Sequence, residues 1–253
     1  MQRDDWYTSD RDPRKLADPE SVGRYAAQRA LARLNARKIS TQRVPVLFEA
    51  PLASGLLGAF VQAVSGGALY RKSSFLLDSL GKTVFPKHIH IAEDPLIHGA
   101  MGSAPFDDEG VRVSARDVVS GKVQGYFLSC YTARKLGMTS TGNAGGSHNL
   151  FMRSDLTTPS DDLNAMIRKM HRGLLVTEVM GQGVNYVTGD YSRGAFGYWI
   201  ENGEIAYPVE EITIAANMKD MFKGIVGIGA DTLCRGTKTV GSILIDEMTI
   251  AGS

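Results

Sequence analysis

Apolar residues recur at helical spacing in several parts of the chain. They repeat every four positions from Val22 to Leu34, after an Asp18-Pro19-Glu20 start that has the order of an N-cap, a first-turn proline and a first-turn acid. This pattern predicts a helix from Asp18 to about Lys38 with one buried stripe. Similar patterns predict helices over residues 52–64, 131–137 and 163–170, and a short one after Asn217. We expect Gly66-Gly67 to end the helix over 52–64.

Other segments have the pattern of strands. Residues 44–48, 84–91, 111–119, 123–130 and 243–250 are rich in β-branched and aromatic residues. Asn202-Gly203 between two such runs predicts a hairpin, because both turn positions need positive φ. A few helices among about ten strands indicate an α+β fold with a β-rich core of mixed or antiparallel sheet. Residues 1–17 show no periodicity, so we expect a linker or frayed terminus followed by one domain over 18–253.

Composition and charge narrow the class of protein. The 253 residues carry a net charge of +1, without the basic excess of a nucleic-acid binder. Cys130 and Cys234 have no metal-type spacing and make no disulfide framework, which favours a reducing cytoplasm. Residues 50–70 contain no charged side chain, but they are too polar and glycine-rich for a membrane helix. We therefore expect a cytoplasmic protein that binds neither membrane nor, directly, nucleic acid.

Five blocks combine glycine, aromatic and charged residues in a distinctive order. The blocks are residues 70–78, 105–110, 133–146, 181–209 and 248–252, and they include Gly-Gln-Gly-Val-Asn and Thr-Gly-Asp-Tyr-Ser-Arg-Gly-Ala. Together they resemble the C-terminal domain of the TldD/PmbA family, with the PmbA (or TldE) branch fitting best. The resemblance implies a cytoplasmic protein with this α+β domain. It also implies that the N-terminal domain of the family is absent here.

Family members of the TldD branch resemble zinc peptidases with His-Glu-x-x-x-His on the helix that corresponds to residues 52–65. Two such histidines hold zinc on one helical face, with the glutamate as general base. The alignment puts Ala59 and Phe60 at the first histidine and the glutamate, Val64 at the second histidine, and Val240 at a further cysteine ligand. Apolar side chains cannot bind zinc. We expect no metal, no cofactor and no catalytic residue in this chain.

The remaining polar groups have structural and functional interpretations. Gly142, Asn143, Gly145 and Gly146 lie in a glycine-rich loop that is either a tight turn or a contact for anions, peptide or partner. Asp190, Tyr191, Ser192 and Arg193 form a dense polar group between strands, where Arg193 could pair with Asp190. This group is either turn scaffolding or a peptide or partner contact. A few further side chains could hold a metal ion: His88, His90, His148 and the acids at 107–109. The alternative is that they face solvent or belong to a turn.

The resemblance implies a function without catalysis in this chain. We expect a PmbA/TldE-type subunit of a cytoplasmic metallopeptidase complex that acts on unfolded or extended peptides, with zinc in a TldD-type partner. The PmbA name also carries a description as a modulator of DNA gyrase, which we take as indirect. Two alternatives remain open. One is a hydrolase in its own right that uses the polar group at 190–193, and the other is a homodimeric interaction module.

Overall fold

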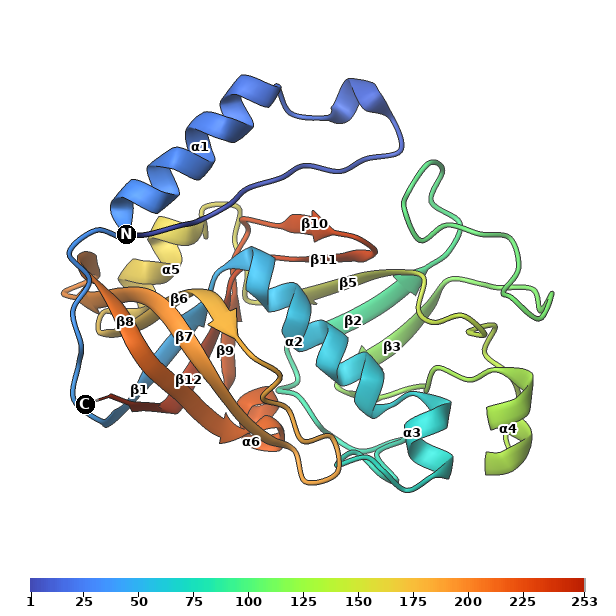
Figure 1. The fold of residues 1–253 in the computed structure, drawn as a ribbon. Helices are drawn as coiled ribbons and strands as arrows, with labels where there is room; N and C mark the ends of the chain where they lie inside the picture. Colours follow the sequence, from blue (N-terminus) through green and yellow to red (C-terminus); the bar gives the residue numbers. More distant parts are fainter. Residues whose placement is uncertain (253) are drawn as a thin grey trace.

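The chain forms an α+β structure with two sheets, as predicted (Figure 1). A computed structural model describes residues 1–252. Within them lie a 3-10 turn at Pro13–Lys15 and the helices α1 (Pro19–Ala32), α2 (Ala50–Ala63), α3 (Gly66–Tyr70), α4 (Cys130–Leu136), α5 (Leu163–Met170) and α6 (Met218–Lys223). None of the helices described is long and apolar enough to cross a bilayer.

The first sheet closes into a small barrel. Its strands are β1 (Gln42–Phe48), β6 (Gly173–Met180), β7 (Asp190–Glu201), β8 (Glu204–Asn217), β12 (Ile243–Ala251) and β9 (Ile225–Ile228). The ring runs β1-β6-β7-β8-β12 and closes because β12 pairs antiparallel with β1. β9 pairs with the other half of β12. Closure gives each of these five strands a partner on both sides over part of its length, and β9 remains as an edge strand.

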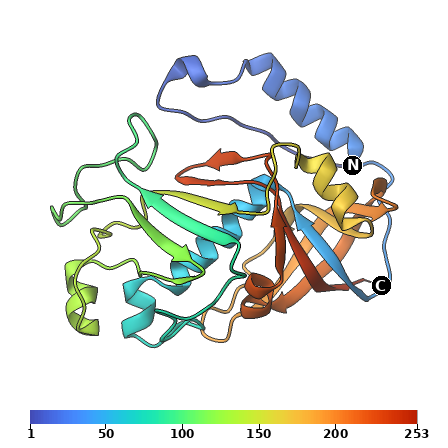
Figure 2. The same cartoon turned by 180° about the vertical axis from the view of Figure 1, so that it is seen from behind.

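The second sheet is open. It consists of β10 (Leu233–Arg235), β11 (Lys238–Val240), β5 (Asn149–Ser154), β2 (Ile89–Asp94), β3 (Arg116–Ser120) and β4 (Lys122–Val123), in that order across the sheet. β10 and the two-residue β4 are its edges. Figure 2 shows this sheet beside the barrel, seen from behind.

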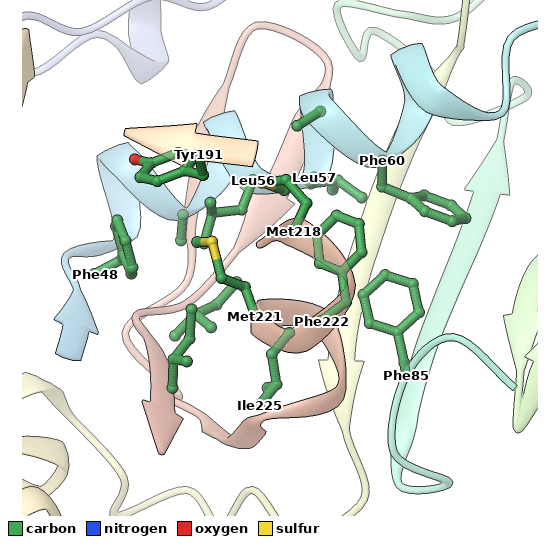
Figure 3. Packing of buried hydrophobic residues seen from close by; sticks show 14 of the residues in the cluster. Phe48, Leu56, Leu57, Phe60, Phe85, Tyr191, Met218, Met221, Phe222 and Ile225 are labelled. Carbon is green, nitrogen blue, oxygen red and sulfur yellow. The ribbon is translucent and has the colours of Figure 1, made fainter. Parts of the chain in front are cut away.

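Helix α2 lies against both sheets and joins their cores. It contacts β6 of the barrel and β10 and β11 of the second sheet. Its buried residues include Leu56, Leu57 and Phe60, which belong to one large apolar cluster shared by the two halves. Figure 3 shows these side chains meeting Met218, Phe222 and others from α6. A smaller cluster on the outside of the barrel packs under α5.

Several predicted elements are confirmed. Asn202 and Gly203 both have positive φ, 54° and 76°, in the turn between β7 and β8. The Asp18 side chain caps α1, and Asn217 caps α6. Gly137, at φ 67°, closes α4 as expected.

Three predicted features are wrong in detail. α1 ends at Ala32, because Asn35 takes a left-handed conformation at φ 61°. Its stripe is only half-buried, and Leu34 is 47% exposed. Gly66 does not simply end α2 but begins α3, where a Cβ would lie 2.3 Å from Thr132 Oγ1 of α4. The predicted helix end is therefore a close contact between two helices.

The strands predicted over 84–91 and 123–130 are shorter than expected. β2 begins only at Ile89, and β4 ends at Val123. Gln124 N still donates to the Val118 carbonyl of β3, but further along the segment the backbone bonds elsewhere. The Phe127 carbonyl accepts from Gly66 N, and the Leu128 carbonyl accepts from Thr141 N and Asn143 N. These partners replace a continued ladder with β3.

Residues 1–17 run as an extended arm beside α1 (Figure 1). Side chains, rather than a strand ladder, make their contacts with the rest of the protein. The Trp6 ring packs edge-on against the Tyr25 ring, with 4.8 Å between the ring centroids. That this segment is a linker stays a prediction.

Candidate functional site

The face of α2 that could have carried zinc ligands is buried and apolar. Ala59 is 5% exposed, and Phe60 and Val64 are fully buried. Val240, at the predicted cysteine position, is also fully buried and lies in β11, which runs alongside α2. All four side chains belong to the same core cluster.

Aromatic rings fill the space beside this face. The Phe60 ring stands edge-on to Phe85 at 5.2 Å and to Phe222 at 6.1 Å between ring centroids. Figure 3 shows the three rings together. None of these groups can bind a metal or transfer a proton. Across residues 1–252, no three His, Cys, Asp or Glu side chains gather where they could hold a metal ion.

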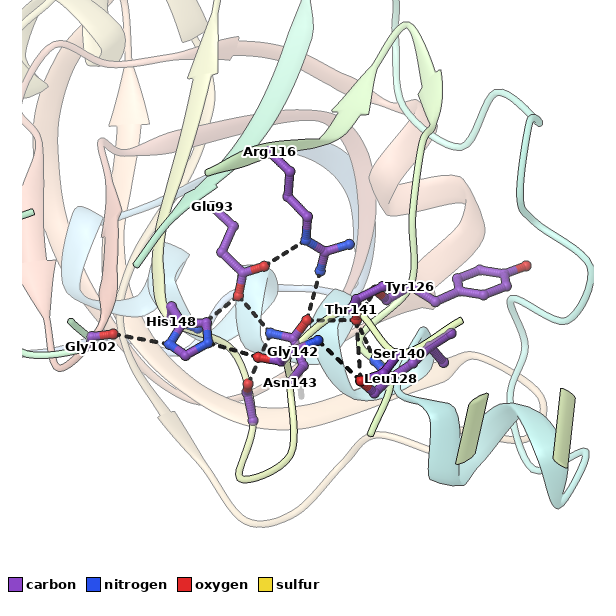
Figure 4. A network of polar contacts seen from close by, with 11 residues as sticks. Glu93, Gly102, Arg116, Tyr126, Leu128, Ser140, Thr141, Gly142, Asn143 and His148 are labelled. Carbon is purple, nitrogen blue, oxygen red and sulfur yellow. Dashed lines mark hydrogen bonds and ion pairs between the residues drawn. The ribbon is translucent and has the colours of Figure 1, made fainter. Parts of the chain in front are cut away.

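The glycine-rich loop at 142–146 is organised by a buried polar network (Figure 4). Asn143 is 6% exposed; its amide nitrogen donates to Glu93 Oε1 at 2.9 Å, and its amide oxygen accepts from Arg116. Glu93 also pairs with Arg116 at 2.8 Å and accepts from His148 N. Gly142, Gly145 and Gly146 have positive φ, so the tight-turn interpretation is confirmed. Gly145 and Gly146 are exposed, whereas Gly142 is buried.

The neighbouring acids at 107–109 form the predicted turn. The Asp107 carboxylate accepts from the backbone N–H groups of Glu109, Val111 and Ala144 at 2.9–3.0 Å. Burial opposes the charge of this carboxylate, but the three hydrogen bonds hold its pKa below the usual range. The Ala144 N–H is therefore already bonded to Asp107 and is not available to a bound anion.

The polar group at 190–193 lies within β7 rather than between strands. Asp190 accepts hydrogen bonds from Thr188 and Asn217, and Arg193 donates to the Gly181 carbonyl, so the expected pairing of Arg193 with Asp190 is wrong. Because strand side chains alternate, Asp190 and Ser192 are exposed while Tyr191 is buried. Burial raises the pKa of Tyr191 to about 12, which keeps its hydroxyl protonated. Peptide or partner contact by this group stays a prediction.

The histidines have local hydrogen-bond partners. His88 Nδ1 lies 2.9 Å from Ser154 Oγ, and His90 Nε2 lies 2.7 Å from Asp155 Oδ2. His88 lies before the start of β2, and His90 lies within it. The ring nitrogens of His148 face the carbonyls of Gly102 and Gly142. No hydrogen bond of the described part of the chain joins a histidine to Ser192 or Tyr191.

A charged cleft between the N-terminal arm and the body was missed by the sequence patterns. Its volume is about 490 Å³, and Arg29, Arg33 and Arg235 line it together with Asp4 and Trp6 of the arm. Arg29 is held by Glu49 at 2.7 Å and by Asp4 at 3.2 Å. Burial opposes the charge of Arg29, but Glu49 and Asp4 hold its pKa above the usual value. The acidic-aromatic order of residues 4–7 was the available signal.

The chain is similar in sequence to proteins of a single family. Residues 41–252 match the family model described as the PmbA/TldA metallopeptidase C-terminal domain. A "Metalloprotease PmbA homolog" of Haemophilus influenzae is 50% identical over 254 residues, covering 100% of this chain and 56% of the relative.

Solved structures agree with this match. A crystal structure from Bacteroides thetaiotaomicron, described as a candidate modulator of DNA gyrase, superposes with a TM-score of 0.88 at 28% identity, covering 95% of this chain and 54% of that one. TldE from Thermococcus kodakarensis gives a TM-score of 0.80 at 23% identity, covering 94% and 56%. The chain spans about half the length of the curated relatives it matches.

Proposed function

Because the chain belongs to the PmbA/TldD metallopeptidase family, we propose that it serves as a non-catalytic subunit of a two-subunit zinc peptidase. Its partner is a TldD-type chain that carries the zinc and the general base. The complex acts in the cytoplasm on unfolded or extended peptides. The printed name of the Haemophilus relative, metalloprotease, describes the activity of the complex in this proposal rather than of this chain.

The buried apolar face of α2 carries the proposal. A peptidase metal needs at least three protein ligands and an open position for water. Here Ala59, Phe60 and Val64 offer carbon atoms only, and they are packed without solvent access. The same helix that would hold a catalytic ion instead joins the two sheets.

The proposed contribution to peptide binding is a wall of the cleft. An extended peptide can add to a sheet only at a free edge. Three edge strands are available for such pairing: β9 beside the closed barrel, and β10 and β4 at the two sides of the open sheet. The exposed members of the predicted contact set would face the partner or the peptide; they are Gly145, Gly146, Asp190 and Ser192.

Mixing the purified chain with a TldD-type partner tests the proposal. We expect no hydrolysis of an unfolded peptide by this chain alone, and a rate on mixing that exceeds that of the partner alone. Ser192→Arg should reduce the gain, whereas Ser160→Arg, at an exposed serine before α5, should not. A partner that cleaves equally fast by itself contradicts the subunit role.

A homodimeric interaction module is the second candidate, and an apolar surface favours it. Side chains of α1, β6 and β8 line a groove of about 420 Å³ that includes Tyr25, Leu175 and Ile205. Ile205 is 52% exposed and Leu31 on α1 is 66% exposed. Light scattering of the isolated chain separates the two candidates: a stable dimer that the Ile205→Glu variant dissociates would favour the homodimer.

A further inference from the structure

The N-terminal arm lies on the body as an extended peptide lies in a binding groove. Along residues 1–8 exposed and half-buried side chains alternate strictly, with even positions turned inward. This is the period of an extended chain resting on a surface. The groove beneath is formed by α1, the first turn of α2, β6 and β10.

Three inward side chains make specific contacts. The Gln2 amide nitrogen donates to Glu210 Oε2 at 2.8 Å. The Asp4 carboxylate lies 3.2 Å from Arg29 Nε and 3.6 Å from Arg33 Nη1. The Trp6 ring is held between two guanidinium groups, with its centroid 5.3 Å from Arg29 Cζ and 4.6 Å from Arg235 Cζ. The groove therefore selects a carboxylate and, two residues later, a large aromatic ring.

Within residues 1–8, two backbone carbonyls accept hydrogen bonds from the body. Arg33 Nη1 donates to Arg3 O at 2.6 Å, and Arg235 Nη1 donates to Tyr7 O at 2.9 Å. Both donors are side chains, and no strand ladder joins residues 1–8 to the sheets in the described structure. An occupant held in this way can exchange without breaking a sheet.

The charges of the groove fit an acidic occupant. Without Asp4, Arg29 keeps Glu49 and Arg33 keeps Glu178, while Arg235 has no carboxylate partner among the described ion pairs. Arg33 is 6% exposed, and its Nε has no hydrogen-bond partner. The walls of the groove therefore keep a free N–H donor at Arg33 Nε and carry a net positive charge.

We propose that this groove is a binding site for an extended peptide segment with a carboxylate two residues before a large aromatic side chain, and that residues 2–8 are its exchangeable resident occupant. A segment of the same kind from another chain displaces the arm and uncovers the Arg235 side chain. The proposal concerns binding alone and stands apart from the proposed subunit role, because its test needs neither partner nor activity.

The test uses a fluorescent peptide of residues 1–10 and the full chain with its arm weakened by Asp4→Ala and Trp6→Ala. Fluorescence anisotropy should show at least about tenfold tighter binding to this variant than to the unchanged chain, because a tethered arm competes at millimolar effective concentration. A peptide of the same composition, without a carboxylate two residues before an aromatic, should not bind. Equal binding of the two peptides overturns the proposal.

Variants of the groove wall complete the test. Arg235→Ala on the weakened-arm background should lower the affinity by about tenfold, since Arg235 contacts only the arm through its hydrogen bond and ring stacking. Arg153→Ala, at an exposed residue of β5 in the same sheet, should have no effect. In the chain with its arm intact, Arg235→Ala should also speed tryptic cleavage at Arg11 several-fold. Unchanged cleavage and unchanged affinity overturn the proposal.

Discussion

Replacing Phe60 with alanine tests whether the α2 face is core or a remnant of a catalytic surface. The side chain is fully buried between Phe85 and Phe222. Losing its transfer free energy costs about 2 kcal/mol. A residual cavity of roughly 80 Å³ adds about 2 kcal/mol at ~24 cal/mol per Å³. We expect the free energy of unfolding to fall by about 3–5 kcal/mol.

Urea denaturation followed by circular dichroism measures this change. Gln62→Ala is the matched control, because Gln62 is an exposed residue of the same helix, and its substitution should change stability by less than about 0.5 kcal/mol. Phe60→Leu should retain most of the stability because it keeps an apolar side chain. A loss below about 1 kcal/mol for Phe60→Ala would refute the packing described for α2.

Two further predictions concern the acidic turn beside the glycine loop. Asp107→Asn should cost about 1–3 kcal/mol, because an amide nitrogen would face the Ala144 N–H in place of an acceptor. Folding lowers the pKa of Asp107, so its carboxylate stabilises the fold above its unfolded pKa of about 4, and this stabilisation is lost as pH falls through the folded pKa. In thermal melts between about pH 5 and 2, the melting temperature of the variant should therefore fall less steeply with pH than that of the unchanged chain. An equally steep fall in both proteins would contradict this. The Glu109 carboxylate, with some burial, raises the pKa of the Cys130 thiol, so Glu109→Gln should shift the iodoacetamide reactivity of Cys130 to lower pH, with exposed Cys234 as the internal reference; no shift would rule out control by Glu109.

Local patterns were sufficient where a few neighbouring residues determine the conformation. The Asn202-Gly203 turn needs positive φ at two adjacent positions, and the Asn217 cap needs one side chain near the next turn. The strand positions of β1 and β12 were also readable. Their pairing, which closes the barrel, joins Gln42 to Ile250. Periodicity within a short stretch of sequence carries no information about a contact between residues that are so far apart in the chain.

The charged cleft could not be predicted for a similar reason. Asp4 meets Arg29 and Arg33 only because the chain folds back along α1, and Arg235 arrives from the far end of the sequence. That the side chains of Ala59, Phe60 and Val64 cannot bind zinc followed from residue type alone. Their complete burial among aromatic rings became evident only from packing.

The central claim is that this chain contributes no metal and no catalysis of its own. The direct measurement is zinc content, together with hydrolysis of an unfolded peptide, for the purified chain alone and after mixing with a TldD-type partner. We expect substoichiometric zinc and no turnover for the chain alone, and turnover on mixing that exceeds that of the partner alone. Stoichiometric zinc and turnover in the isolated chain would contradict it.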